Sequence, residues 1–201
     1  MRLILLRHGE TVWNIDKRLQ GHDDSPLSER GIEQAKSIAG SVQALKPVRA
    51  VTSDLGRARQ TAALIGYGFA PGDERLRELN MGEWTGERKS DLIANQPQRY
   101  RDWRAGRYTP AGGESWDDFV LRIRTALESV VYQGAGDLLA VVHSGVVRAA
   151  CFSFLGLKPA QLLPVTPGTL TILEFDADPS TPPRLEAYNL GAFGPDSAVA
   201  D

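Results

Sequence analysis

Cysteine is almost absent from this chain, since Cys151 is the only one among 201 residues. A single cysteine excludes a disulfide framework within the chain. Its neighbours Ala149, Ala150 and Phe152 are apolar. We therefore expect a buried, inert thiol at position 151 and not a nucleophile.

Long apolar runs and a strong charge of either sign are also missing. The N-terminal apolar stretch covers only residues 3–6 before Arg7 interrupts it, which is too short for a signal-peptide core, so we expect a cytoplasmic protein. A net charge of -2 and a hydrophobic content of 42% favour a globular protein that binds neither nucleic acid nor a membrane. The length suits one domain, expected over 1–193, followed by a disordered tail over 194–201.

Histidine is scarce as well, and two of the three histidines occupy matching positions. Residues 3–9 read Leu-Ile-Leu-Leu-Arg-His-Gly, and residues 138–145 read Leu-Leu-Ala-Val-Val-His-Ser-Gly. Such apolar runs are typical of strands buried on both faces of a parallel sheet. One such histidine would be explained by a turn that it stabilises. Two favour a ligand site, because open α/β sheets bind ligands beyond the carboxyl ends of their strands.

Strands and helices alternate along the rest of the sequence. Strands are predicted over 2–7, 48–52, 138–142, 170–175 and 184–188, with one of the last two antiparallel at an edge. Helices are predicted after Ser28 and Ser53 as N-caps, over 117–132 and over 145–155. The fold class is therefore α/β, with a mostly parallel central sheet, helices on both faces and a small helical cap insert over 87–111.

Four residues with charged or titratable side chains come from the ends of these strands or from the helix starts that follow them: Arg7, His8, Arg57 and His143. Two arginines beside two histidines make a poor metal site, because their positive charge opposes a second cation. They make a good oxyanion site, since a guanidinium matches a pair of phosphate oxygens. The positive field also keeps a histidine neutral and able to attack. This combination favours phosphoryl transfer through histidine.

The sequence resembles the histidine phosphatase superfamily, in the branch that also contains cofactor-dependent phosphoglycerate mutase. The resemblance starts at 7–11, Arg-His-Gly-Glu-Thr, and covers residues 1 to about 155. The further matching blocks, in family order, are 13–14, 20–21, 26–31, 53–61, 76–78, 82–86, 112–115 and 142–145.

The resemblance implies a role for each matching residue. His8 matches the nucleophile that becomes phosphorylated, and Arg7 and Arg57 match the arginines that hold the phosphoryl oxygens. His143 matches the second histidine of the phosphate pocket. Glu78 matches the carboxylate that protonates the leaving oxygen.

Further positions match substrate contacts. Asn14 matches a phosphate contact, and Gln20, Gly21 and Ser144 are expected in the substrate site. Ser144 departs from the family pattern, in which glycine is more usual, so we expect a tuned pocket. His22 falls in a variable loop and is not assigned to the substrate.

Other carboxylates compete with Glu78 for the role of acid. We expect Glu10 and Glu114 to be structural and Glu83 to lie at the surface or rim. The insert carries six basic residues against two acidic ones between 88 and 108. They form either an anion-attracting cap or solvated helix faces. The aromatic residues Tyr100, Trp103 and Tyr108 either line the cleft or pack the cap onto the body.

We therefore expect a metal-independent phosphomonoesterase, without a cofactor, that hydrolyses small phosphorylated metabolites through a phosphohistidine. A phosphoglycerate mutase is the nearest alternative, but mutases carry a longer insert than the 34-residue step from Glu78 to Gly112. A catalytically silent phosphate-ligand binder and a His-His-Glu metal hydrolase are two further candidates. A homo-oligomer is compatible with the sequence.

Overall fold

A six-stranded sheet forms the centre of the computed structural model, which describes residues 1–178 and 180–193. The strand order is β3-β2-β4-β1-β5-β6. β3, β2, β4 and β1 run parallel, whereas β5 is antiparallel to β1 and β6 is antiparallel to β5. The strands are β1 (Arg2–Arg7), β2 (Arg49–Ser53), β3 (Gly72–Asp73), β4 (Leu138–Val142), β5 (Leu170–Glu174) and β6 (Arg184–Leu190). The predicted mostly parallel sheet is confirmed, with two antiparallel pairings in place of the expected one.

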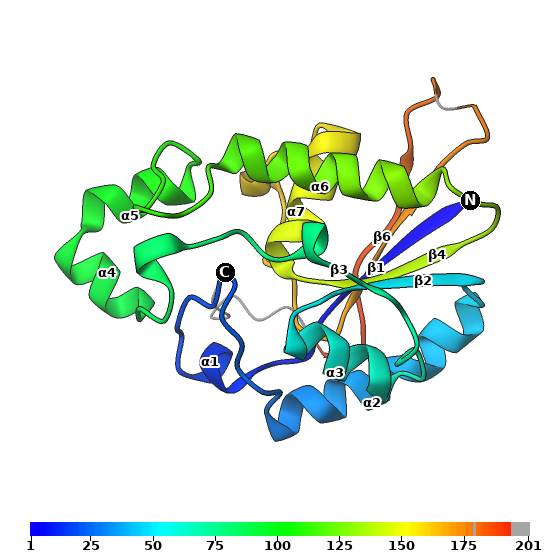
Figure 1. Cartoon of the computed structure of the whole chain (residues 1–201), viewed down its shortest axis with the longest axis horizontal. Coiled ribbons are helices and arrows are strands. Elements are labelled where there is room, and N and C mark those ends of the chain that lie inside the picture. The colour runs from blue at the N-terminus through cyan, green and yellow to red at the C-terminus, as the bar shows by residue number, and fades with distance from the viewer. Residues whose placement is uncertain (179, 194–201) are drawn as a thin grey trace.

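Helices cover both faces of the sheet, as Figure 1 shows. Successive side chains of a strand point to opposite faces. Ile4 and Leu6 of β1 therefore belong to the cluster that contains side chains of α2 (Glu29–Leu45) and α3 (Gly56–Leu64). Leu3 and Leu5 belong to the cluster under α6 (Trp116–Val131) and α7 (Ser144–Leu155). This double burial explains why the strands read as continuous apolar runs.

The insert after Glu78 forms two short helices, α4 (Lys89–Asn95) and α5 (Pro97–Arg104). They lie at the left of Figure 1, on the side toward which β1 runs. The smaller elements are α1 (Val12–Ile15) and the 3₁₀ turns η1 (Glu74–Leu76), η2 (Gly82–Trp84) and η3 (Pro159–Gln161).

An aromatic cluster joins the insert to the body of the protein. Trp84 is buried, and its ring centroid lies 5.4 Å from Tyr108, 5.8 Å from Trp103 and 6.4 Å from Tyr100. The interpretation that these aromatics pack the cap onto the body is therefore confirmed. Trp103 and Tyr108 also line the main cavity.

The two predicted N-caps have different outcomes. Ser28 caps α2, since its hydroxyl accepts a hydrogen bond from the Gly31 N–H at 3.0 Å. The prediction for Ser53 is wrong, because α3 begins at Gly56 and its N-cap, Leu55, makes no side-chain bond. The carboxylate of Asp24 accepts from the N–H groups of Gly56 and Arg57 instead. A loop far away in sequence thus satisfies this helix end.

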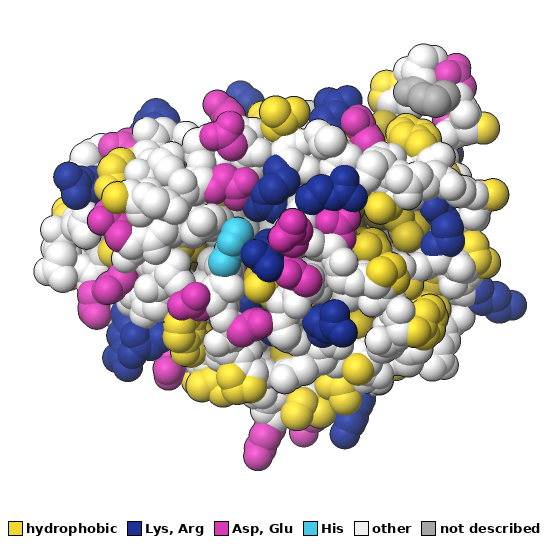
Figure 2. All heavy atoms as spheres, in the orientation of Figure 1, with side chains coloured by type: hydrophobic (Ala, Val, Ile, Leu, Met, Phe, Trp, Pro, Cys, Tyr) yellow, Lys and Arg dark blue, Asp and Glu magenta, His cyan; other side chains and the backbone are white. Residues whose placement is uncertain are grey.

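The remaining features agree with a globular chain. In the described residues, no helix is long and apolar enough to cross a membrane. Cys151 is fully buried, as expected, and burial raises the pKa of its thiol to about 12. Lys and Arg side chains are interspersed with Asp and Glu on the face shown in Figure 2. The predicted tail, 194–201, lies outside the described residues.

Candidate active site

The predicted site residues meet where three neighbouring parallel strands end. His8 follows β1 and His143 follows β4, and the His8 N–H bonds to the Val142 carbonyl at 3.0 Å. β2 pairs with β4 on its other side and leads into α3, which carries Arg57 in its first turn. The sheet topology thus brings together residues that lie more than 130 positions apart in the sequence.

The ring of His8 is held with one nitrogen committed to the backbone. Its Nδ1 lies 2.7 Å from the carbonyl oxygen of Gly9. Because a carbonyl only accepts, the neutral ring carries its proton on Nδ1, and the lone pair is on Nε2. His8 lines the main cavity although its residue is only 3% exposed. Nε2 is the atom able to attack.

His143 packs edge-on against His8, with ring centroids 5.2 Å apart at an interplanar angle of 63°. Its Nε2 lies 2.8 Å from the Ser53 hydroxyl oxygen. That oxygen also accepts from the Leu55 N–H at 3.4 Å, and the hydroxyl hydrogen can donate to Nε2. Nδ1 of His143 is a buried atom without a hydrogen-bond partner among the described residues.

Two buried arginines complete this end of the site. The Arg57 guanidinium donates to the carbonyls of Gly21 at 2.8 Å and Asp23 at 2.7 Å, and it pairs with Asp24 at 3.1 Å. Arg7 donates to the Val165 carbonyl. These bonds fix both guanidinium groups before any ligand binds, so they are preorganised for an oxyanion.

The positive charges act on the histidines. Burial, together with the charges of Arg57 and Arg7, holds the pKa of His8 well below its ordinary value. Burial and Arg57 likewise hold the pKa of His143 well below that value. Burial also lowers the pKa of Arg57, which stays a cation because an arginine starts from 12.5. Both imidazoles are therefore neutral at pH 7, as the sequence predicted.

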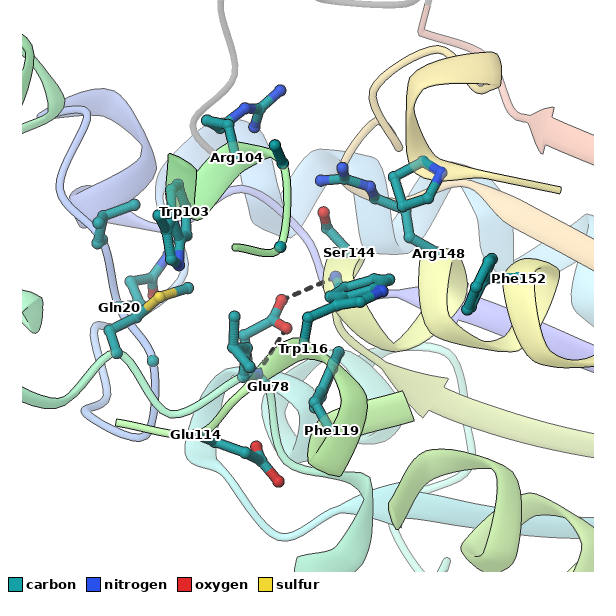
Figure 3. Close-up of a pocket in the computed structure, with 18 of the residues that line it drawn as sticks. Gln20, Glu78, Trp103, Arg104, Glu114, Trp116, Phe119, Ser144, Arg148 and Phe152 are labelled. Carbon is teal, nitrogen blue, oxygen red and sulfur yellow. Dashed lines mark hydrogen bonds between the residues drawn. The ribbon is translucent and has the colours of Figure 1, made fainter. Parts of the chain in front are cut away.

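Glu78 is positioned by two backbone N–H groups. Its Oε1 accepts from Leu79 at 2.8 Å and its Oε2 accepts from Gly145 at 2.9 Å (Figure 3). A Cβ atom on Gly145 would lie 2.9 Å from the Glu78 carboxyl carbon and would collide with Oε1. Only glycine at the start of α7 therefore permits this carboxylate to approach.

The other carboxylates have the structural positions expected of them. Glu10 accepts from the Ser28 hydroxyl at 2.8 Å. Glu114 lines the cavity but forms an ion pair with Arg122 at 2.6 Å. Glu83 is exposed and borders a different, smaller pocket beside α4.

The main cavity has a volume of about 490 Å³. Eight of the nine predicted site residues line it: Arg7, His8, Asn14, Gln20, Gly21, Arg57, Glu78 and Ser144. His143, the ninth, is not among the lining residues; it is fully buried and packs against the ring of His8. His22 is not among the lining residues, and its ring Nε2 bonds to the Glu78 carbonyl at 3.0 Å.

Sequence reasoning missed several residues of this site. Ser53 orients His143, and Asp24 holds Arg57. The cavity is also lined by Trp116, Phe119, Arg148 and Phe152, which Figure 3 shows. Ser144, Arg148 and Phe152 are four residues apart on α7, and positions four apart share a helix face. The predicted place of Ser144 in the site could therefore have pointed to the other two.

The basic residues of the insert divide between the two predicted arrangements. Of the six, all of which the structure describes, Arg104 lines the cavity. Arg107 pairs with Asp102 at 2.7 Å, and Arg101 bonds to Gln98. Most of this charge therefore lies on solvated helix faces. No group of three or more His, Cys, Asp or Glu side chains in the described part of the chain is arranged to hold a metal ion.

Comparison with known proteins decides the family. The profile of the histidine phosphatase superfamily (branch 1) matches residues 3–189. The chain belongs to the histidine phosphatase superfamily. The predicted family and the predicted phosphomonoesterase class are thereby confirmed.

Individual members of the superfamily are similar over most of their length. A glucosyl-3-phosphoglycerate phosphatase of Mycolicibacterium vanbaalenii is 36% identical, over 83% of this chain and 79% of the relative. A probable phosphoglycerate mutase GpmB of Serratia proteamaculans is 38% identical, over 78% and 76%. The solved structure of a mycobacterial glucosyl-3-phosphoglycerate phosphatase with VO3 has a TM-score of 0.82 at 32% identity and covers 94% of this chain and 98% of its own.

Proposed function

We propose that this histidine phosphatase hydrolyses phosphomonoesters of small metabolites in two steps, with His8 as the nucleophile. The observation that carries the proposal is the commitment of His8 Nδ1 to Gly9, which leaves Nε2 as a neutral nucleophile between two buried arginines. Arg7 and Arg57 hold the phosphoryl oxygens, and the Nδ1–H of His143 donates to one of them. Asn14, Gln20, Gly21 and Ser144 complete the substrate contacts.

In the first step, His8 Nε2 attacks phosphorus and the bond from phosphorus to the leaving oxygen breaks. The carboxyl of Glu78 gives its proton to that oxygen, so the product leaves as an alcohol. In the second step, water attacks phosphorus and the bond to Nε2 breaks. Glu78, now a carboxylate, takes the proton of the attacking water. The enzyme returns to its starting state and releases inorganic phosphate.

The relatives give two candidate substrates. Glucosyl-3-phosphoglycerate is the substrate in the names of several of them, and phosphoglycerate is the substrate of the probable mutases. The short insert favours hydrolysis over isomerisation of the substrate, because a mutase must exclude water from its phosphohistidine. A location in the cytoplasm and assembly into a homo-oligomer stay predictions.

The test is a panel of phosphomonoesters that includes both candidates, sugar phosphates and p-nitrophenyl phosphate. Phosphate release and isomerised phosphoglycerate are measured on the same samples, with and without excess chelator. We expect phosphate release that persists in chelator, because the arginines supply the positive charge. Isomerisation faster than hydrolysis, with bisphosphoglycerate present, would identify a mutase. Loss of activity in chelator with recovery on added metal would refute the proposed mechanism.

A further inference from the structure

Arg122 of α6 binds the segment that carries Glu78 to the cavity. Its Nη1 donates to the carbonyls of Arg75 at 2.7 Å and Arg77 at 3.1 Å, and its Nη2 donates to the carbonyl of Glu78 at 3.3 Å. The remaining N–H groups, on Nε and Nη2, donate to the two carboxylate oxygens of Glu114 at 2.8 and 2.6 Å. All five N–H donors of this guanidinium are therefore used.

Glu114 orients the guanidinium of Arg122. The Arg122 side chain is 22% exposed and that of Glu114 is 17% exposed, so water and salt screen the pair only weakly. Two parallel bonds to one carboxylate also fix the plane of the guanidinium. In Figure 3 the Glu114 carboxylate points away from that of Glu78. Glu114 thus holds Arg122, and Arg122 holds the backbone of the segment that ends at Glu78.

A second donor reaches the same carbonyl from the loop that holds Arg57. His22 Nε2 lies 3.0 Å from the Glu78 carbonyl oxygen, and since a carbonyl only accepts, this Nε2 carries a proton. The residues on either side of His22 accept from Arg57 through their carbonyls, Gly21 at 2.8 Å and Asp23 at 2.7 Å. One loop therefore contacts both the backbone of Glu78 and an arginine of the phosphate pocket.

We propose that Arg122, with His22, is a positioning residue for Glu78 and sets the distance from its carboxyl group to the leaving oxygen. The inference rests on the proposed function, in which Glu78 is the general acid. Proton transfer requires the two oxygens to approach within about 2.6–3.2 Å, and a displacement of about 1 Å can cost about 10²-fold in rate. The N–H groups of Leu79 and Gly145 hold the carboxyl group, and the bonds to the carbonyl fix the backbone from which it extends.

This role requires a guanidinium and not merely a positive charge. A planar fork of five donors reaches three backbone carbonyls and a carboxylate at the same time. A lysine ammonium has its three donors on one atom, so it cannot make the same set of bonds. Arg122→Lys keeps the charge beside Glu114 but loses most of the bonds to the Glu78 segment. The lysine variant therefore separates positioning from charge.

The first test compares leaving groups in Arg122→Met and Arg122→Lys. We expect both variants to lower kcat about 10- to 100-fold on sugar phosphates, and by less than about threefold on p-nitrophenyl phosphate, whose phenolate needs little protonation. Arg124→Met is the matched control and should change neither rate. Arg124 lies on the same helix and also bonds to a carboxylate and a carbonyl, but these belong to Glu128 and Ser153.

A double-mutant cycle shows whether Arg122 acts through Glu78. In the Glu78→Gln background, Arg122→Met should lower kcat on sugar phosphates by no more than about twofold, the usual error of additivity, because the acid is already absent. A residue that merely supports the fold would cause the same loss in both backgrounds and with both leaving groups.

His22 gives an independent reading if the Arg122 variants fail to fold. His22 is only half-buried, and His22→Ala removes one of the two side-chain donors to the Glu78 carbonyl. It should lower kcat on sugar phosphates about three- to tenfold, the effect of one hydrogen bond, and change p-nitrophenyl phosphate turnover less. A glutamine amide keeps an N–H donor, so His22→Gln should restore most of the loss.

The outcomes separate this inference from the proposed function. A selective loss on sugar phosphates in Glu78→Gln, together with unchanged or equally lowered rates for both leaving groups in the Arg122 and His22 variants, would overturn the inference and leave the acid role intact. No selective loss in Glu78→Gln itself would overturn the proposed acid, and the inference with it.

Discussion

Each of the two buried histidines uses one ring nitrogen for structure and leaves the other for chemistry. Nδ1 of His8 is hydrogen-bonded to the Gly9 carbonyl, and Nε2 of His143 is hydrogen-bonded to the Ser53 hydroxyl. His8 therefore has a lone pair on Nε2. In the proposed mechanism the Ser53 hydroxyl donates to Nε2 of His143, so that ring offers an N–H to the phosphoryl ligand. A nucleophile and a hydrogen-bond donor arise from the same residue type because their second partners differ.

The histidine titrations test this arrangement directly, because only three histidines are present. Burial lowers the pKa of all three, and the two site histidines also lie beside Arg57. We expect NMR titration to place each pKa below about 6.5, with His22 the least shifted. Saturating inorganic phosphate should raise the pKa values of His8 and His143. His22→Ala assigns the signals, and a His8 pKa above 6.5 in free enzyme would contradict the account.

Glu78 is tested through the leaving group. A general acid contributes about 10²–10⁴-fold when the leaving oxygen departs poorly. Glu78→Gln should therefore lose activity in that range on sugar phosphates and much less on p-nitrophenyl phosphate, whose phenolate needs little protonation. Glu83→Gln is the control, since Glu83 is exposed outside the main cavity. Equal losses on both substrates would show that Glu78 positions the substrate and does not act as an acid.

The sequence revealed the residues that stand in contiguous motifs. Arg7 and His8 are adjacent at the end of one strand, and Arg57 and His143 follow other strands. Each could therefore be placed at the carboxyl end of the parallel strands. Ser53 and Asp24 could not be assigned correctly. Their partners, His143 and Arg57, lie 90 and 33 residues away, and local spacing carries no information on such contacts.

At the scale of elements, the N-terminus of α7 is the junction on which the site depends. It carries Ser144 into the cavity, and the Gly145 N–H holds Glu78. The first N–H groups of a helix lack partners within the helix, so the Gly145 N–H is available to hold the Glu78 carboxyl group.

Gly145→Ala should disrupt this junction. The added methyl group collides with the Glu78 carboxyl group, which must shift from the position that the Gly145 N–H gives it. We expect the activity profile of Glu78→Gln, with a larger loss on sugar phosphates than on p-nitrophenyl phosphate. Gly40→Ala is the control, because nothing lies within 4 Å of a Cβ there, and it should stabilise α2 by about 0.5–1 kcal/mol. Unaltered kinetics in Gly145→Ala would mean that Glu78 has no catalytic role.

Elements with strong periodicity were predictable, and short ones were not. The helix predicted over 117–132 is found as α6, one residue earlier, and β1 and β4 have the predicted bounds. β3 has two residues and α1 has four. Such segments form because neighbouring strands or loops hold them, so no pattern of their own marks them.

At the scale of the whole molecule, the buried neutral histidines link stability to pH. The pKa values of His8 and His143 are lower in the folded state than in the unfolded state, so the unfolded chain binds more protons below about pH 6.5. Above that pH both histidines are neutral in both states, and the free energy of unfolding has its full value. It decreases as the pH falls from about 6.5 toward the pKa values of the two histidines in the folded state. Each contributes a slope of about 1.4 kcal/mol per pH unit in this window.

Denaturant unfolding at pH 7.5, 6.5 and 5.5, without phosphate, measures this effect. The free energy of unfolding should fall as the pH decreases, and the slope should be smaller in His8→Ala. The result against the account is a protein that becomes more stable between pH 6.5 and 5.5.

The order of the strands in the sheet brings together site residues from distant parts of the sequence. β4 inserts between β1 and β2, so His8, Arg57 and His143 lie at the same end of the sheet although they are far apart in the sequence. Alternation of strands and helices predicted a parallel sheet, but the strand order was not predicted. The resemblance to the histidine phosphatase superfamily assigned the site residues to one pocket, which the periodicity of the sequence alone could not do.

The phosphorylated enzyme is the most direct test of the central claim, that His8 carries the phosphoryl group. Enzyme quenched in alkali during turnover of a ³²P-labelled substrate should retain label that is stable in alkali and released by acid, and peptide mapping should place it on His8. His22→Ala should keep the label, and His8→Ala should remain folded without label or turnover. Label on a serine or a carboxylate, or full activity of His8→Ala, would contradict the mechanism.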